Sequence, residues 1–180
     1  MPGQTHPVFL SLHTKLGRLE QEIANVHEFV QLAAVTPKEF SSPWGTAMTI
    51  GGGVRNAYNG MEDILKTIAR DIDGYVPGGE NWHQDLLDQM AAASDVRPAI
   101  LGTDLHEQMV ALKSFRHVVN HNYGMALKLD RVRENLAVLQ QAYPQFVEAI
   151  TSFEAAFSAG GEDDGHDERS PAKGPGEQPV

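Results

Sequence analysis

The sequence predicts an all-α fold, an up-down helical bundle of four to five helices with a disordered acidic C-terminal tail. Through the first 158 residues, apolar side chains recur every three or four positions, and no run alternates as a half-buried strand would. From about Ala159 the chain becomes rich in Gly, Asp, Glu and Pro, with too few apolar residues to offset the entropy of ordering. Residues 1–158 are therefore predicted to form one helical domain, and residues 159–180 a disordered tail.

The first two helices are predicted from two long apolar stripes. The first stripe predicts a helix from about residue 7 to Ala34, which ends there because the residue before Pro37 disfavours helical conformation. The second stripe, from Ala47 to Ile72, predicts a helix over about residues 44–75. Three consecutive glycines, at positions 51–53, interrupt this stripe without changing its phase. We therefore expect one helix whose glycines allow close packing against a neighbour, with a kink as the alternative.

The rest of the domain is predicted to hold a short helix and two longer regions of helix. The short helix follows a loop that contains several glycines and a proline. Thr103 or Asp104 can cap the next helix, which should end or distort within Asn120–Gly124, because that segment is poor in helix formers. A last stripe, from Leu129 to Phe157, passes through Pro144 in register, so we expect a kink there or two abutting helices.

Composition and charge narrow the classes of function. Hydrophobic residues make up 41% of the chain and charged residues 21%, as in ordinary globular proteins. Without cysteine there are no disulfides or thiolate metal sites, and we expect a cytoplasmic protein without a signal peptide or a membrane span. The net charge of -10 argues against broad binding of nucleic acid. Residues 108–135 nevertheless hold five lysines and arginines against two acids, which indicates a confined phosphate site or simply solvated helix charges.

The pattern Arg116-x4-His121-x-Tyr123 is the sharpest feature of the sequence. RNA can be cut without a metal when its 2′-hydroxyl attacks the adjacent phosphorus, and this reaction needs a base, an acid and a cation. Arginine binds phosphate oxygens and keeps its charge, whereas histidine titrates near neutrality and suits proton transfer. Arg116 and His121 are therefore the candidate catalytic residues, as phosphate stabiliser and proton-transfer residue.

Residue chemistry alone leaves other interpretations of this pattern open. A spacing of five puts Arg116 and His121 about 140° apart on an ideal helix, so they share a site only if the segment distorts or a second subunit completes it. Arg116 could instead form a surface ion pair, and His121 could cap a helix. His117 and His121 do share a face, but no acidic residue accompanies them in the pattern of a metal site, so no metal is expected.

The same pattern resembles the RX4HXY motif of HepT-like ribonuclease toxins in the HEPN superfamily. Two other segments are similar to this family. Tyr58–Leu65 carries a tyrosine and a glutamate among apolar residues, and the loop and short helix from Asp73 to Leu87 follow it. The resemblance covers roughly residues 7–158 and leaves out the acidic tail.

The resemblance implies an all-α homodimer in which the motifs of two subunits face each other across a composite cleft. It also implies a metal-independent endoribonuclease toxin of a toxin–antitoxin system, which cuts an RNA substrate and needs no cofactor. We expect the dimer interface on the apolar stripe that follows residue 104. The expected partner is a minimal nucleotidyltransferase (MntA-like) antitoxin that modifies the motif tyrosine, Tyr123, with AMP; without the resemblance, Tyr123 could instead pack on the bundle.

Four further residues are candidates for substrate binding: Trp82, His83, His117 and Asn120. Trp82 and His83 could hold a nucleobase by stacking, or Trp82 could pack its loop onto the bundle. Glu62, one turn after Tyr58, could orient the motif residues, although a solvated glutamate is the expectation. Two other functions stay open: a catalytically silent HEPN module that binds RNA or nucleotides, and a helical dimerisation protein without a nucleic-acid role.

Overall fold

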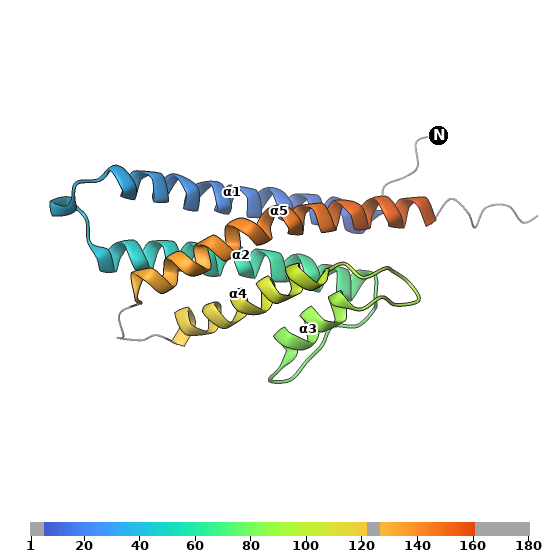
Figure 1. Ribbon diagram of the computed structural model, residues 1–180. Helices are drawn as coiled ribbons and strands as arrows, with labels where there is room; N and C mark the ends of the chain where they lie inside the picture. The colour runs from blue at the N-terminus through green and yellow to red at the C-terminus, as the bar shows by residue number, and fades with distance from the viewer. Residues whose placement is uncertain (1–5, 122–126, 161–180) are drawn as a thin grey trace, which may run out of the picture.

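Five α-helices form the bundle in the computed structural model, which describes residues 6–121 and 127–160 (Figure 1). The helices are α1 (Pro7–Val35), α2 (Pro43–Asp71), α3 (Trp82–Ala91), α4 (Thr103–His121) and α5 (Leu129–Gly160), with a short 3-10 turn at Lys38–Phe40. The described residues contain no strand beyond one isolated bridge between Ser94 and Arg97. The predicted all-α fold is confirmed, and none of the described helices is long and apolar enough to cross a membrane.

Helix α2 is the centre of the bundle, because it packs against α1, α3, α4 and α5. Its apolar side chains are almost all buried, from Ala47 and Val54 through Ile64 to Ile68. Figure 1 shows the four long helices running lengthwise, with the short α3 at one edge beside α4. Residues of α2 therefore face every other helix, and a polar side chain on α2 can meet partners from two of them at once.

The ends of α1 and α2 follow from local sequence. Helix α1 ends at Val35, close to the predicted Ala34, and α2 begins at Pro43, where the Ser42 hydroxyl accepts a hydrogen bond from the Gly45 amide at 3.1 Å. The predicted end of α2 at residue 75 was wrong, since the helix stops at Asp71. Gly74 adopts a left-handed φ of 68° just beyond, which reverses the chain before another turn can form.

The three consecutive glycines lie inside one uninterrupted helix, as predicted. A Cβ atom on Gly53 would lie 2.3 Å from Cγ2 of Val26 on α1, so only glycine lets the two helices approach this closely. Gly60, seven residues later, also faces α1, where a Cβ atom would lie 3.3 Å from Leu19. Close packing is thus confirmed at Gly53, against α1, whereas Gly51 faces Phe115 of α4 and a Cβ atom on Gly52 would meet nothing within 4 Å.

Helix α5 runs through Pro144 as one continuous helix, so the alternative of two abutting helices was wrong. A proline inside a helix costs about 3 kcal/mol, because it removes a backbone hydrogen bond and its ring crowds the preceding turn. Buried apolar residues on both sides of it, from Val132 to Phe153, offset this cost by packing on α2 and α4. The helix continues to Gly160, and the rest of the predicted tail, 161–180, lies outside the described residues.

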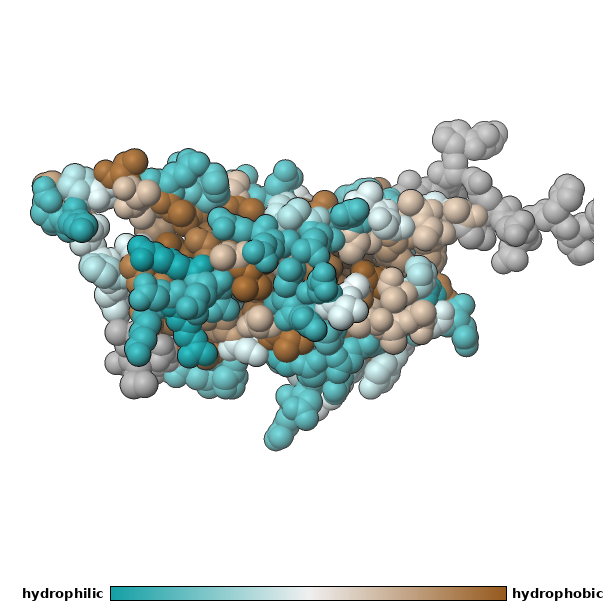
Figure 2. Space-filling model, in the orientation of Figure 1, coloured by the Kyte–Doolittle hydropathy of each residue, from teal (hydrophilic) through white to brown (hydrophobic). Residues whose placement is uncertain are grey.

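The apolar stripe of α4 is not available to a second subunit, contrary to the expectation for the dimer interface. Its members Leu105, Met109, Leu112 and Phe115 are buried inside the subunit, where α4 packs on α2, α3 and α5. Val119, the last member, is partly buried against the same core. On the face of the molecule that Figure 2 shows, hydrophilic residues are widespread and hydrophobic residues appear in smaller areas among them. Any dimer must therefore use other apolar residues.

Candidate active site

Arg116 lies on α4 and points toward polar side chains of two other helices. Its Nε donates a hydrogen bond to Oδ1 of Asn59 on α2 at 2.8 Å. Its Nη1 lies 3.1 Å from Nε2 of His83 on α3. The arginine is only partly exposed, so it is not the solvated surface ion pair that the sequence left open. Two helices hold the guanidinium in one orientation.

Glu62 lies behind His83 and is buried, with 5% of its surface exposed. Its Oε1 accepts a hydrogen bond from the Tyr58 hydroxyl at 2.8 Å and lies 2.5 Å from Nδ1 of His83. The expectation of a solvated glutamate was wrong, because α3 covers this stretch of α2. A buried carboxylate is costly unless hydrogen bonds satisfy it, and the phenol and the imidazole supply two.

Tyr58 remains a hydrogen-bond donor in this arrangement. The side chain is fully buried, and burial raises the pKa of its phenol far above the ordinary value; the charge of Glu62 raises it further. The hydroxyl therefore keeps its proton and donates to the carboxylate. Tyr58, Glu62, His83, Arg116 and Asn59 form one connected network, which we call the Arg116 network.

An ion pair on the far side of α3 fixes that helix beside α2. Arg97, almost completely buried, binds both carboxylate oxygens of Asp73, with its Nε and Nη2 at 2.7 and 2.8 Å. The same guanidinium donates to the backbone carbonyls of Gln89 and Ala92 at 2.9 and 3.0 Å, which caps the end of α3. Because α3 is anchored in this way, His83 at its start is held against Glu62.

A cavity of about 380 Å³ opens beside Arg116. It is lined by Glu80, Asn81, His83 and Gln84 of the α3 segment and by Lys113, Ser114, Arg116 and His117 of α4. Lys113 reaches across to the Gln84 side-chain oxygen with a short hydrogen bond. The cations Lys113 and Arg116 lie on the α4 wall, opposite the amides of Asn81 and Gln84 and the single carboxylate of Glu80. Because the two cations outnumber the one acid, the lining suits an anion such as a phosphodiester.

His121, the last residue of α4, is exposed and stacks on His117, with ring centroids 4.1 Å apart. Its Nδ1 lies 2.9 Å from the carbonyl oxygen of His117, and because a carbonyl only accepts, Nδ1 carries a proton. Within residues 6–121 and 127–160, no side chain or backbone group hydrogen-bonds to its Nε2. His117 lines the cavity and His121 follows one turn later. The structure thus places Arg116 inside the cavity and connects His121 to its edge through His117.

The remaining candidates lie in different surroundings. Asn120 is exposed on α4, and Tyr123 falls outside the described residues. Trp82 is half-buried, with its ring centroid 3.6 Å from that of His83 and the Lys66 ammonium 4.6 Å from its centre. These contacts favour a tryptophan that packs the start of α3 onto α2. The sequence did not indicate Asn59 or Lys113 as residues of the site, although Lys113 belongs to the segment 108–135, which is rich in lysine and arginine.

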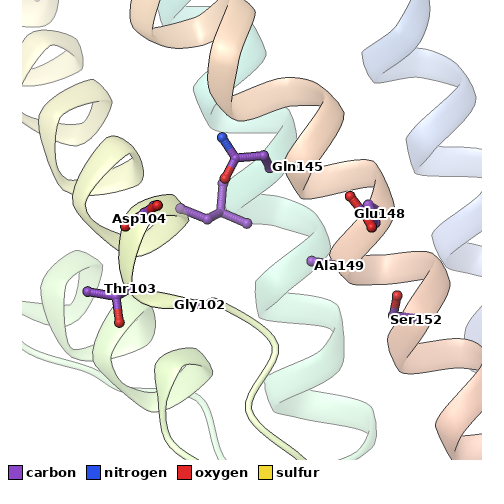
Figure 3. Close-up of a pocket in the computed structure, with 8 residues that line it drawn as sticks. Gly102, Thr103, Asp104, Gln145, Glu148, Ala149 and Ser152 are labelled. Carbon is purple, nitrogen blue, oxygen red and sulfur yellow. The ribbon is translucent and has the colours of Figure 1, made fainter.

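A larger cavity, of about 480 Å³, lies between the start of α4 and the second half of α5 (Figure 3). Its polar lining includes the carboxylates of Asp104 and Glu148 and no lysine or arginine. Such a lining repels phosphate, so this cavity does not compete with the one at Arg116. In the described residues, no three His, Asp or Glu side chains are grouped so as to hold a metal ion.

The fold and the site define an all-helical domain whose polar cavity is built around one α4 arginine, held from α2 and α3. A family model described as HepT-like protein matches residues 49–157, the segment from α2 to α5. The chain belongs to the HepT-like family, a branch of the HEPN superfamily. No curated protein and no solved structure matches it.

Proposed function

We propose that this protein is a metal-independent endoribonuclease and the toxin of a toxin–antitoxin system. The observation that carries the proposal is the position of Arg116: two helices orient its guanidinium, and it lines a cavity with Lys113 and His117. A cation held in advance can stabilise the charge of a pentacoordinate phosphate without reorganising during the reaction. Membership of the HepT-like family supports the choice of RNA as the substrate.

In the proposed reaction, the RNA 2′-hydroxyl loses its proton and attacks the adjacent phosphorus. The bond from phosphorus to the 5′-oxygen breaks, and that oxygen takes up a proton. The products are a 2′,3′-cyclic phosphate and a free 5′-hydroxyl. His121 transfers a proton through Nε2, since its Nδ1 is engaged by the His117 carbonyl, and Arg116 binds the phosphate oxygens. A second subunit completes the proton-transfer set, since each motif supplies one such histidine.

The partner we propose is a minimal nucleotidyltransferase antitoxin, which adds AMP to Tyr123. The tyrosine follows His121 by two residues, so AMP there would bring a bulky anion close to the site for the RNA phosphate. Repulsion and steric block would then inhibit cleavage without unfolding the protein. Mass spectrometry of the co-expressed pair should locate AMP on the peptide that contains Tyr123, and AMP found on Tyr143 instead would contradict this assignment.

RNA cleavage by the purified protein tests the catalytic roles. The wild type should cut RNA in the presence of a chelator and leave cyclic phosphate ends. Arg116→Ala and His121→Ala should each lower the rate by about 10²–10⁴-fold, because each removes a group that acts in the transition state. The matched controls are Arg70→Ala and His27→Ala, which alter exposed side chains outside the cavity. Full activity in His121→Ala would contradict the assignment.

A further inference from the structure

His83 stands between the buried Glu62 and Arg116, and both of its ring nitrogens are engaged. Nδ1 lies 2.5 Å from Glu62 Oε1, and Nε2 lies 3.1 Å from Arg116 Nη1. The imidazole is mostly buried, with 22% of the side chain exposed. Trp82 covers it at a ring distance of 3.6 Å. His83 therefore has little freedom to turn toward a substrate.

Hydrogen-bond chemistry fixes the protonation state of this imidazole. A guanidinium has only donors, so Nε2 of His83 must accept the hydrogen bond from Arg116. An imidazole whose Nε2 accepts carries its single proton on Nδ1, and that N–H donates to Glu62. The ring in this arrangement is neutral. It links the buried Glu62 carboxylate to Arg116 through one hydrogen bond on each ring nitrogen.

We propose that His83 is a positioning residue for Arg116, held in its neutral Nδ1–H form by Glu62 and Tyr58. This inference rests on the proposed ribonuclease and gives His83 a role other than substrate binding. Asn59 fixes the Nε side of the guanidinium and His83 fixes Nη1, which leaves the other N–H groups for the phosphate. Arginine side chains have many rotamers, so fixing two of their nitrogens before the substrate arrives lowers the entropic cost of binding the transition state.

Two observations argue for positioning over direct proton transfer or base stacking by His83. Its Nε2 lone pair is already occupied by Arg116, so no nitrogen is free to take a proton from a 2′-hydroxyl. The face of its ring near Trp82 is covered by that side chain, so a nucleobase cannot stack there. His121 is exposed at the end of α4 and uses only Nδ1 for its hydrogen bond to His117, so it is better placed for proton transfer.

Kinetics of RNA cleavage test the role. His83→Ala should lower kcat by about 10²-fold with a smaller change in KM, because a displaced guanidinium loses contacts mainly in the transition state. His83→Gln should recover part of the loss, since its side-chain carbonyl can accept from Arg116. The control is His106→Ala. His106 also contacts a carboxylate, Asp88, at 2.7 Å, and its side chain is 24% exposed, but it lies outside the cavity.

Nitrogen NMR of the full-length protein gives a readout that does not depend on activity. The spectrum should show the Nδ1–H form of His83, and the Arg116 Nε–H signal should shift in His83→Ala but not in His106→Ala. An Nε2–H form of His83, or an Arg116 signal and kcat unchanged by His83→Ala, would overturn the positioning role. If the wild type does not cut RNA, the proposed function is wrong. If its Arg116 signal still changes in His83→Ala, the contact between His83 and Arg116 is nevertheless supported.

Discussion

Tyr58 is a phenol without access to water, and its only hydrogen bond in the described structure goes to a buried carboxylate. The side chain is fully buried, and its hydroxyl donates to Glu62 at 2.8 Å. Burial raises the pKa of Tyr58, and the Glu62 charge adds to this, because a phenolate would be both desolvated and repelled. The folded protein therefore keeps this proton at pH values at which an unfolded chain releases it.

The higher pKa of Tyr58 in the folded protein predicts that the free energy of unfolding falls at alkaline pH. The folded pKa is raised above the unfolded one, so the contribution is fully present below about pH 10 and is lost as the pH rises further. Between about pH 9 and 11, the free energy of unfolding should fall more steeply for the wild type than for Tyr58→Phe, which has no proton to lose there. Urea denaturation across this range measures both slopes. Parallel slopes would show that Tyr58 ionises normally.

The contact between helices α1 and α2 depends on which glycine of α2 faces α1. A Cβ atom on Gly53 would lie 2.3 Å from Val26, whereas a Cβ atom on Gly52 would meet nothing within 4 Å. The two glycines are neighbours in one helix and differ only in the face they occupy. Replacing each of them by alanine therefore separates the effect of helix propensity on stability from the effect of packing against α1.

Alanine at the two positions should therefore have opposite effects. Gly52→Ala should stabilise the protein by about 0.4–1 kcal/mol, because alanine restricts the unfolded chain and fits the helix without strain. Gly53→Ala should destabilise it by about 1–3 kcal/mol, because the added methyl forces α1 and α2 apart. Chemical denaturation with linear extrapolation gives both values. Equal effects of the two substitutions would mean that α1 does not pack on Gly53.

The proposed dimer needs an apolar surface that the bundle leaves uncovered. Four large apolar side chains are exposed around the turn between α1 and α2: Leu32, Val35, Phe40 and Trp44. Figure 1 shows this turn at the same end of the bundle as the C-terminal end of α4, which carries His121. A second copy seated there would cover apolar surface at the end of the bundle at which α4 ends.

Light scattering should then give about twice the 19.7 kDa mass of one chain. Phe40→Asp should shift the protein toward monomer and lower RNA cleavage with it, because a charge in an apolar interface is costly to desolvate. The control is Val96→Asp, since Val96 is also exposed, at 56%, but lies in the loop between α3 and α4. A monomeric wild type that still cuts RNA would contradict the composite site, and a dimeric Phe40→Asp would exclude this surface.

The positions of the helices, and the family of the protein, follow from the amino-acid sequence alone. The helical period of apolar residues is a local property, so it placed α1 within one residue of its observed end and kept α2 intact across three glycines. It placed the end of α2 at residue 75 instead of Asp71, because the apolar stripe continues to Ile72 while the turn depends on Gly74. The matched segment, residues 49–157, confirms the HepT-like resemblance that the motif suggested.

The contacts between polar side chains depend on how the helices pack, which the sequence pattern does not show. Arg116 is 57 positions from Asn59 and 33 from His83, and no local pattern relates residues so far apart in sequence. Glu62 looked like a surface residue, because its burial depends on α3 folding back over α2. Likewise the stripe of α4 predicted a surface for a partner, and the other helices of the same chain cover it. Periodicity shows that a helix has an apolar face, whereas only the packing of the helices shows what covers it.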